Sequence, residues 1–220
     1  LIRYKGFNTS VALAFLNDKN DATYSFYKDL PKKRLTEKIK PAQRGDLVLF
    51  GSSFATNDDV RNSLLDFINQ SRLQGAFIMY DPNYRQPKEN DLDRVVARIK
   101  ENIGLSHIVK GSDDDFYNIF NTSDPLEIKK NVFDLGCHKL VITRNKKSSL
   151  AYLDNDFVEL KIPQITPVST IGAGDNFNAG ILYGIDSELD ENTKTLDFSI
   201  EQWEGIIEHG ICFATEVCLS

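Results

Sequence analysis

The sequence has few of the residues and patterns on which several protein classes depend. Its three cysteines, Cys137, Cys212 and Cys218, form no Cys-x-x-Cys pair and no disulfide framework. We therefore expect free thiols in a reducing cytosol, and a cytoplasmic protein. The three histidines share no metal-ligand spacing with one another or with cysteine, which argues against a zinc site. No apolar run reaches the roughly 18 residues of a membrane span, so no membrane partner is expected.

Two common nucleotide-binding motifs are also missing. The sequence lacks Gly-x-x-x-x-Gly-Lys-Ser/Thr, which excludes a P-loop enzyme, and Gly-x-Gly-x-x-Gly, which leaves dinucleotide binding without support. The formal net charge of −6 argues mildly against a nucleic-acid partner, because phosphate backbones attract basic surfaces. The 220 residues, 41% hydrophobic and 26% charged, are an ordinary globular composition with enough apolar residues for one substantial core.

From residue 46 onward, short apolar strands alternate with amphipathic helices. Because parallel strands need crossover helices, this pattern predicts an α/β fold with a doubly wound, mostly parallel sheet flanked by helices. Ligands of such folds bind at the carboxyl ends of the strands. The pattern predicts strands at 46–51, 76–80, 106–109 and 139–143, a hairpin at 149–160, a helix starting at 56–59, and helices at 91–103, 113–120, 125–135, 173–183 and 200–218.

The first thirty residues have a different character. Residues 9–16 and 22–27 are rich in β-forming residues, and a polar stretch separates them. This pair predicts a hairpin, either a small unit of its own or edge strands of the main sheet. We accordingly divide the chain into the hairpin region, residues 1–30, and an α/β core, residues 31–220.

The most informative stretch is Thr170–Gly180, with the sequence Thr-Ile-Gly-Ala-Gly-Asp-Asn-Phe-Asn-Ala-Gly. Its glycines predict a sharp turn into a helix, and the first N–H groups of a helix have no partners within it. Together with the helix dipole, these groups form a site for a phosphate-like anion. Asp175 falls at the same place, and a carboxylate beside an anion hole suits phosphoryl transfer to a hydroxyl. Four residues alone would equally fit a glycine turn with Asp175 as helix N-cap.

The longer run, Ser169 to Gly180, resembles the C-terminal signature of the ribokinase-like (PfkB) carbohydrate kinases. The resemblance implies a ribokinase-like fold and an ATP-dependent sugar kinase. In it Asp175 is the catalytic base that deprotonates the sugar hydroxyl, and the N–H groups of Gly172, Ala173 and Gly174 are the anion hole. It also implies that the hairpin region is part of a small β lid over the sugar, which often forms a homodimer contact.

The sequence departs from the family pattern in two places. Ser169 stands where the family usually has an aspartate that helps to bind a monovalent cation, so activation by such a cation stays open. The family's N-terminal strand, substrate-binding aspartate and Gly-Gly pair have no counterpart here. The resemblance therefore implies a kinase whose N-terminal quarter is missing from this sequence.

The run Asp81-Pro82-Asn83-Tyr84-Arg85 directly follows a predicted strand. By itself it reads as a Pro-Asn turn with a solvated arginine. The family carries a similar Asp-Pro-Asn-x-Arg run whose asparagine and arginine reach the substrate or the transferring phosphate. The resemblance therefore implies substrate-binding roles for Asn83 and Arg85, and the planar fork of an arginine suits a phosphate.

Two further strand ends carry weaker matches. Ser112-x-x-Asp115 stands where the family has Asn-x-x-Glu, whose glutamate acts on Mg²⁺ through water, although an acidic helix start with a serine cap explains the composition equally well. Asp115 remains an oxygen ligand of the type that Mg²⁺ prefers. Thr143 and Arg144 stand in the family's nucleotide-binding turn, but its glycines are absent here, and a solvated basic loop is the alternative.

These observations predict an ATP-dependent carbohydrate kinase using Mg²⁺ and acting on a sugar hydroxyl, with fructose favoured by resemblance to family fructokinases. Ribose, a 2-keto-3-deoxy sugar acid or a nucleoside are alternative substrates. A non-catalytic sugar- or nucleotide-binding homologue is the alternative class, and retention of Asp175 with its whole turn argues against it, because a binding module has no need of a base.

Overall fold

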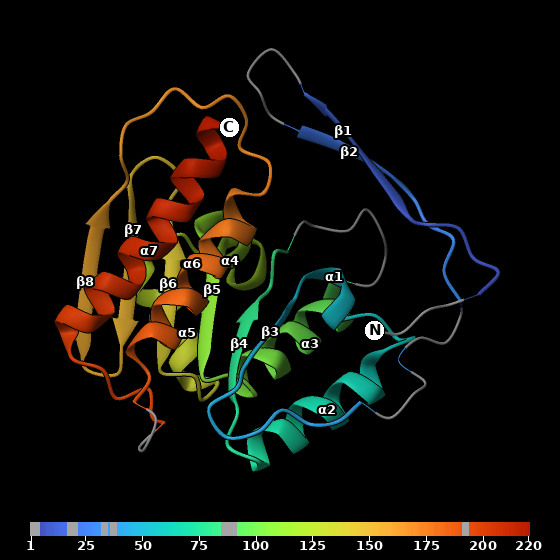
Figure 1. The fold of residues 1–220 in the computed structure, drawn as a ribbon, viewed down its shortest axis with the longest axis horizontal. Helices are drawn as coiled ribbons and strands as arrows, with labels where there is room; N and C mark the ends of the chain where they lie inside the picture. Colours follow the sequence, from blue (N-terminus) through green and yellow to red (C-terminus); the bar gives the residue numbers. More distant parts are fainter. Residues whose placement is uncertain (1–4, 17–21, 32–34, 36–38, 85–91, 191–193) are drawn as a thin grey trace.

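The structure, a computed structural model, describes the chain except residues 1–4, 17–21, 32–34, 36–38, 85–91 and 191–193. Its main body is a six-stranded sheet in the order β3-β4-β5-β6-β7-β8 (Figure 1). Neighbours from β3 to β6 are parallel, and β7 and β8 join antiparallel. The strands are β3 (Leu47–Gly51), β4 (Phe77–Asp81), β5 (Ile108–Ser112), β6 (Lys139–Thr143), β7 (Ser148–Leu153) and β8 (Asp156–Lys161).

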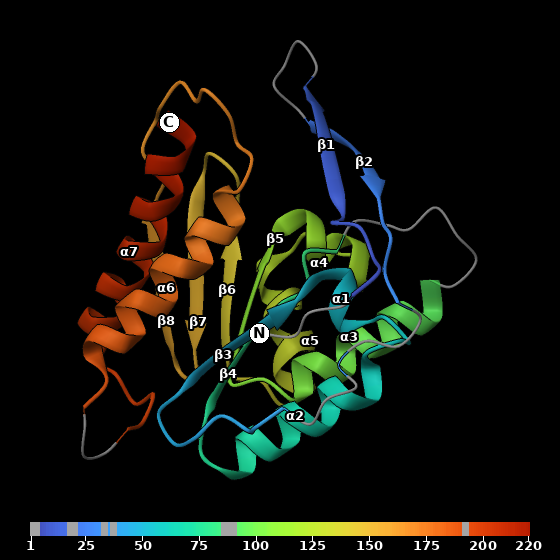
Figure 2. The same cartoon turned by 45° about the vertical axis from the view of Figure 1, so that its right-hand side comes forward.

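Helices cover both faces of this sheet, which confirms the predicted fold class (Figure 2). Side chains of a strand alternate between faces, and in β4 Ile78 and Tyr80 join one core while Met79 joins the other. The first core is completed by α1 to α5 and the second by α6 and α7. The helices are α1 (Ser52–Ala55), α2 (Arg61–Leu73), α3 (Leu92–Gly104), α4 (Asp113–Phe120), α5 (Pro125–Asp134), α6 (Ala173–Glu188) and α7 (Ile200–Leu219).

Helices α6 and α7 pack unusually closely. A Cβ placed on Gly180 of α6 would lie 2.3 Å from the carbonyl oxygen of His209 and 2.7 Å from the Cα of Gly210, both in α7. On the same interface the Tyr183 ring contacts the His209 ring edge-on, with centroids 5.0 Å apart. The backbones can approach this far only because Gly180 has no side chain.

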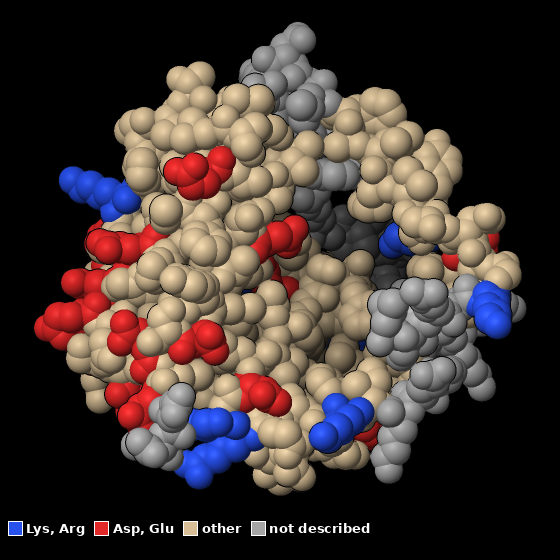
Figure 3. All heavy atoms as spheres, in the orientation of Figure 1, with Lys and Arg blue, Asp and Glu red and all other residues tan. Residues whose placement is uncertain are grey.

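The outer surface of α7 is acidic. Figure 3 shows acidic side chains gathered over the side of the molecule formed by α6 and α7, and Glu201, Glu204, Glu208 and Glu216 of α7 are exposed. Within the described ranges, no helix is both long enough and apolar enough to cross a membrane.

Strands β1 (Val11–Leu16) and β2 (Ala22–Tyr27) form a separate two-stranded antiparallel sheet. They pair as a hairpin, as predicted, and they are not edge strands of the main sheet. The hairpin extends away from the body in both ribbon views (Figures 1 and 2).

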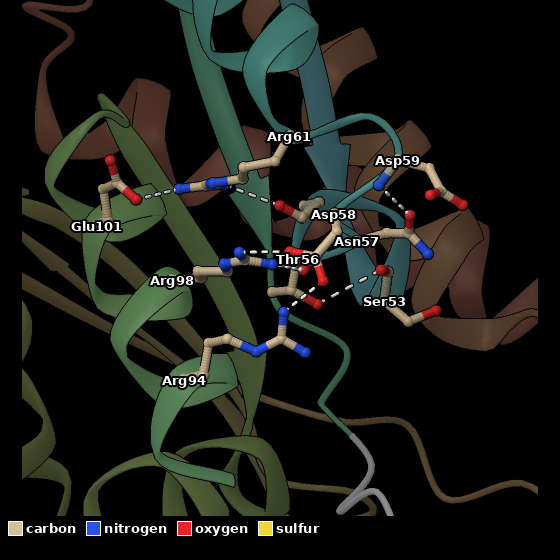
Figure 4. Close-up of polar contacts among 10 residues, drawn as sticks. Ser53, Thr56, Asn57, Asp58, Asp59, Arg61, Arg94, Arg98 and Glu101 are labelled. Atoms are coloured by element: carbon tan, nitrogen blue, oxygen red, sulfur yellow. Dashed lines mark hydrogen bonds and ion pairs between the residues drawn. The ribbon is translucent and has the colours of Figure 1, made fainter. Parts of the chain in front are cut away.

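The chain leaves β3 differently from the prediction. A single helix starting at residues 56–59 was expected, but α1 begins directly after β3 and α2 begins only at Arg61. The intervening loop is held against α3 (Figure 4). Asp58 forms ion pairs with Arg94 and Arg98. Arg98 also donates a hydrogen bond to the carbonyl oxygen of Thr56 at 2.7 Å. Asp58 therefore anchors this loop to α3, and residues 56–59 are not the start of a helix.

The side chain of Arg61, at the start of α2, completes this attachment from inside. Its guanidinium donates to the carbonyl oxygen of Ala55 at 2.8 Å and to Oδ1 of Asn102 at 2.6 Å, and it pairs with Glu101. Arg61 and Asn102 are both buried. A buried charge is tolerated only when it is paired and hydrogen-bonded, and Arg61 meets both conditions.

Candidate active site

The parallel strands end on polar or small residues at one edge of the sheet. The register places Gly51 of β3 beside Asp81 of β4, and Ser112 of β5 beside Thr143 of β6. The predicted strand 106–109 was placed too early in the sequence, because β5 begins at Ile108 and continues to Ser112. The first turns of α6 meet this edge, since Asn178 of α6 donates to Asp81. The motifs that the sequence analysis selected are thus brought together.

The predicted anion hole is the turn into α6. Its N-cap residue, Gly172, has φ 80°, a left-handed conformation that favours glycine. The N–H of Ala173 donates to the carbonyl oxygen of Thr170 at 3.3 Å. Among the described residues, the N–H groups of Gly172 and Gly174 have no acceptor. Two of the three predicted donors are therefore unpaired at the positive end of the α6 dipole.

Asp175 lies in the first turn of α6 and is exposed. Among the described residues, its carboxylate accepts no hydrogen bond. Asn176 behind it secures the turn instead, because its Nδ2 donates to the carbonyl oxygen of Gly172 at 3.0 Å. A carboxylate that is not consumed by capping its own helix can accept a proton from a hydroxyl brought to it.

The Asp-Pro-Asn turn at the end of β4 is built on Asp81. Asp81 is buried, and its Oδ1 accepts the N–H of Asn83 at 3.0 Å. Asn83 itself adopts φ 37° and has an exposed side chain. This local hydrogen bond fixes the turn and leaves the Asn83 amide available to a ligand. Arg85, the other predicted substrate-binding residue, lies outside the described residues.

The sequence analysis missed two residues at this edge. Lys110 of β5 places its Nζ 3.1 Å from Oδ2 of Asp81, and Nδ2 of Asn178 donates to the same oxygen at 2.7 Å. All three side chains are buried. The only signal in the sequence was a lysine directly after a predicted apolar strand, in the same position as the aspartate that follows the preceding predicted strand.

Asp115 holds the Asp-Pro-Asn turn from the other side. Its Oδ1 accepts the N–H of Tyr84 at 2.6 Å, and its Oδ2 accepts the N–H and the hydroxyl of Ser112 at 2.8 and 2.7 Å. Burial raises the pKa of this carboxyl, and the hydrogen bonds from Ser112 oppose that shift. Three of about four acceptor positions of the carboxylate are thus in use. The described residues contain no group of three or more acidic, histidine or cysteine side chains suited to a metal.

The remaining residues named in the sequence analysis are held by hydrogen bonds to nearby backbone. The Thr143 hydroxyl is 3.5 Å from the carbonyl oxygen of Gly111, and the half-buried Arg144 turns back toward β7 through a bond from its N–H to the Ser148 carbonyl oxygen at 2.9 Å. The Ser169 hydroxyl accepts the N–H of Ile171 at 3.1 Å. Ser169 therefore stabilises the approach to the anion-hole turn.

A mostly parallel sheet with unpaired N–H groups and a free carboxylate at its carboxyl edge is typical of the class of α/β proteins that bind ligands at the ends of their strands. The family comparison agrees with this class. The model of the "pfkB family carbohydrate kinase" matches residues 1–196. The chain belongs to the pfkB family of carbohydrate kinases.

Curated relatives in this family have low identity to the chain. A fructokinase of Rhizobium leguminosarum bv. trifolii is 30% identical over 77% of the chain and 53% of its own length. A fructokinase of Vibrio alginolyticus is 20% identical over 89% of the chain and 64% of its own length. The chain thus spans about half to two-thirds of the curated relatives that it matches.

Solved structures show the same fold. Aminoimidazole riboside kinase from Salmonella enterica superposes with a TM-score of 0.77 at 19% identity, covering 90% of this chain and 65% of that one. Fructokinase from Vibrio cholerae O395, in a fructose-, ADP- and calcium-bound form, also gives 0.77 at 21% identity, covering 93% and 67%. At these identities the likeness concerns the fold.

Proposed function

We propose that the protein transfers the γ-phosphoryl group of ATP to a sugar hydroxyl. The observation that carries this proposal is the pair of unpaired N–H groups, on Gly172 and Gly174, next to the free carboxylate of Asp175. Asp175 accepts the proton of the sugar hydroxyl. The N–H groups of Gly172 and Gly174, with Ala173 between them, bind the charge that develops on the phosphoryl group.

The substrates would lie along the carboxyl edge of the sheet. We assign Asn83 and Arg85 to the sugar or the transferring phosphate, and Thr143 and Arg144 to the nucleotide. The exposed Asn83 amide on its fixed turn supports the first assignment. The position of Thr143 at the end of the strand next to β5 supports the second.

Asp115 is the residue that would hold Mg²⁺, which when bound neutralises charge on the phosphates of ATP. One acceptor position remains on its carboxylate. Contact through a metal-bound water fits that position, and Mg²⁺ usually keeps several waters and takes only one or two protein carboxylates. The absence of a three-ligand cluster among the described residues is compatible with this mode of binding.

We favour fructose as the sugar. The relatives named fructokinase, and a neighbouring structure in a fructose- and ADP-bound form, support this choice. A riboside is the alternative substrate, because an aminoimidazole riboside kinase is among both the curated relatives and the structural neighbours. A non-catalytic binding homologue is the alternative class. The Asp175 carboxylate argues against it, because it accepts no hydrogen bond from the described residues and is available as a base.

The hairpin of β1 and β2 is proposed as a lid over the sugar that also joins two copies of the chain. Val11, Leu13 and Phe15 alternate along β1 and therefore share one face, and they are 46%, 42% and 58% exposed. Tyr27, paired with Val11, extends this face. Apolar patches of this kind mark contact surfaces. A Phe15→Lys variant should shift the mass measured by light scattering from dimer to monomer, and an unchanged mass would contradict the dimer.

The deciding experiment is ATP-dependent phosphorylation by the full-length protein with Mg²⁺. The substrates are fructose, ribose, 2-keto-3-deoxygluconate and adenosine, each with and without K⁺. Asp175→Asn should abolish turnover, whereas Asp114→Asn should not, because Asp114 is an exposed aspartate at the start of a different helix, α4. Turnover of one sugar identifies the substrate. Binding of ATP without turnover of any of them would support the non-catalytic homologue, and turnover by Asp175→Asn would remove the base assignment.

A further inference from the structure

The buried ion pair between Lys110 and Asp81 has an unusual location. Lys110 is 4% exposed and Asp81 6%, and the pair lies where β4, β5 and the start of α6 converge. Removing two charges from water has a desolvation cost that their mutual attraction often does not offset. A buried ion pair is therefore weak evidence for a role in stability. Its position relative to the proposed anion hole suggests another role.

The ammonium of Lys110 lies directly behind the anion-hole turn. Its Nζ would be 3.5 Å from a Cβ placed on Gly174, and it is 5.8 Å from the centre of the Phe177 ring. Both residues belong to the first turns of α6. The positive end of a helix dipole repels a cation, so this placement opposes the rule that stabilises helix ends. Local departures of this kind are expected at functional sites.

The hydrogen bonds around this ion pair are incomplete. An ammonium has three protons to donate, and among the described residues Asp81 is the one acceptor recorded for Lys110. Oδ1 of Asn178 is buried without a hydrogen-bond partner. Asn178 nevertheless ties α6 to the same Asp81 oxygen. Asp81 therefore joins three elements: the Asp-Pro-Asn turn through Asn83, the strand β5 through Lys110, and α6 through Asn178.

We propose that Lys110 is a positioning residue of the phosphoryl-transfer site. Its buried ammonium, fixed by Asp81, holds the first turn of α6 in register with the Asp-Pro-Asn turn and supplies a permanent positive charge behind the anion hole. A fixed charge of this kind acts on the negative charge that develops during transfer, and the burial of Lys110 weakens the screening of this charge by water. The inference rests on the proposed kinase function.

The test compares two lysines that each form an ion pair with an aspartate. Lys110→Met removes the cation behind the anion hole. Lys139→Met is the matched control, because Lys139 also pairs with an aspartate, Asp154, at 2.6 Å. Lys139 is the first residue of β6 and therefore lies at the end of that strand away from the candidate site. We expect Lys110→Met in the full-length protein to lower kcat at least tenfold, with the KM for the sugar within about threefold of wild type. Lys139→Met should change neither constant.

A third variant covers the risk that an unpaired Asp81 prevents folding. In Asp81→Asn/Lys110→Met the buried pair is replaced by neutral groups of similar size, and we expect the fold to persist with kcat still reduced at least tenfold. Recovery of wild-type kcat in this double variant would overturn the proposal, since the cation would then be dispensable. A loss confined to KM, or an equal loss in Lys139→Met, would overturn it as well.

Hydrogen exchange separates this inference from the proposed function. Amides of residues 172–176 should exchange faster in Lys110→Met than in Lys139→Met, whether or not a substrate is turned over. If the wild-type protein phosphorylates none of the sugars, the proposed function fails while this comparison still reports on the positioning role. Unchanged exchange in Lys110→Met would overturn the positioning role.

Discussion

The close packing of α6 against α7 makes Gly180 the most sensitive position of the second core. Gly180→Ala would place a methyl group 2.3 Å from the His209 carbonyl oxygen and 2.7 Å from the Gly210 Cα. These are backbone atoms and cannot rotate away. The helices must therefore separate by about 1 Å before the contacts reach the spacing of ordinary packing.

The size of the effect follows from two opposing contributions. Alanine is favoured over glycine in a helix by about 1 kcal/mol. Overpacking a rigid site costs about 3 kcal/mol, the upper end of the usual range. We expect Gly180→Ala to lower the free energy of unfolding by about 2 kcal/mol. Gly205→Ala in α7 is the control, because no atom lies within 4 Å of the added methyl group, and it should stabilise by up to about 1 kcal/mol.

The single tryptophan, Trp203, reports on this interface, because it is buried on α7. Urea denaturation followed by its fluorescence gives a midpoint for each variant, and the shared slope converts the shift to a free energy. The two variants should differ by about 3 kcal/mol. If Gly180→Ala were as stable as Gly205→Ala, the helices would not approach each other as the structure places them.

Three further predictions concern other regions of the protein. Arg61→Met leaves the Ala55 carbonyl oxygen and Asn102 Oδ1 without this donor, and it should lower the free energy of unfolding by about 3 kcal/mol. Lys130→Met breaks an exposed pair with Asp134, and in the same assay it should lower the free energy of unfolding by about 0.5 kcal/mol or less. Burial lowers the pKa of His107, whose neutral Nδ1 accepts the Ile78 N–H, so its contribution to stability is present above about pH 6.5 and is lost as the pH falls. Denaturation midpoints should therefore decline less between pH 7 and 5 in His107→Asn, and an equal decline would contradict this. Ser169→Asp introduces the aspartate that the family usually has at this position, and kcat of this variant should rise when K⁺ is added. If kcat does not respond to K⁺, position 169 does not take part in cation binding.

Much of the candidate site could be selected from the sequence because its residues are neighbours in sequence. The turn before Asp175 needs only local signals, since glycine permits the left-handed conformation of Gly172 and the helix that follows orients the N–H groups. The strand ends were predictable for the same reason, because apolar runs stop at Asp81 and Thr143. Those local patterns were also sufficient to predict the mostly parallel sheet and its helices.

The residues that the sequence did not reveal depend on distant contacts. Lys110 made the predicted strand end at Val109, because a charged residue in an apolar run normally marks a surface. Its burial requires Asp81 on the neighbouring strand, and Asn178 completes the group from α6. Likewise, the acidic loop before α2 was predicted as a helix start, and only the position of α3 shows that Asp58 binds Arg94 and Arg98.

The meeting of Asp81, Lys110 and Asn178 also bears on the order of folding. Asp81 and Asn178 are 97 residues apart in sequence, and contacts over long separations are entropically costly to form first. Strands β4 and β5 can therefore pair early with their charged ends still in water, and those ends are enclosed only when α6 docks. On this view the site is completed in the last stage of folding, so a nascent chain that stops before α6 would expose the carboxyl edge of its sheet to chaperones.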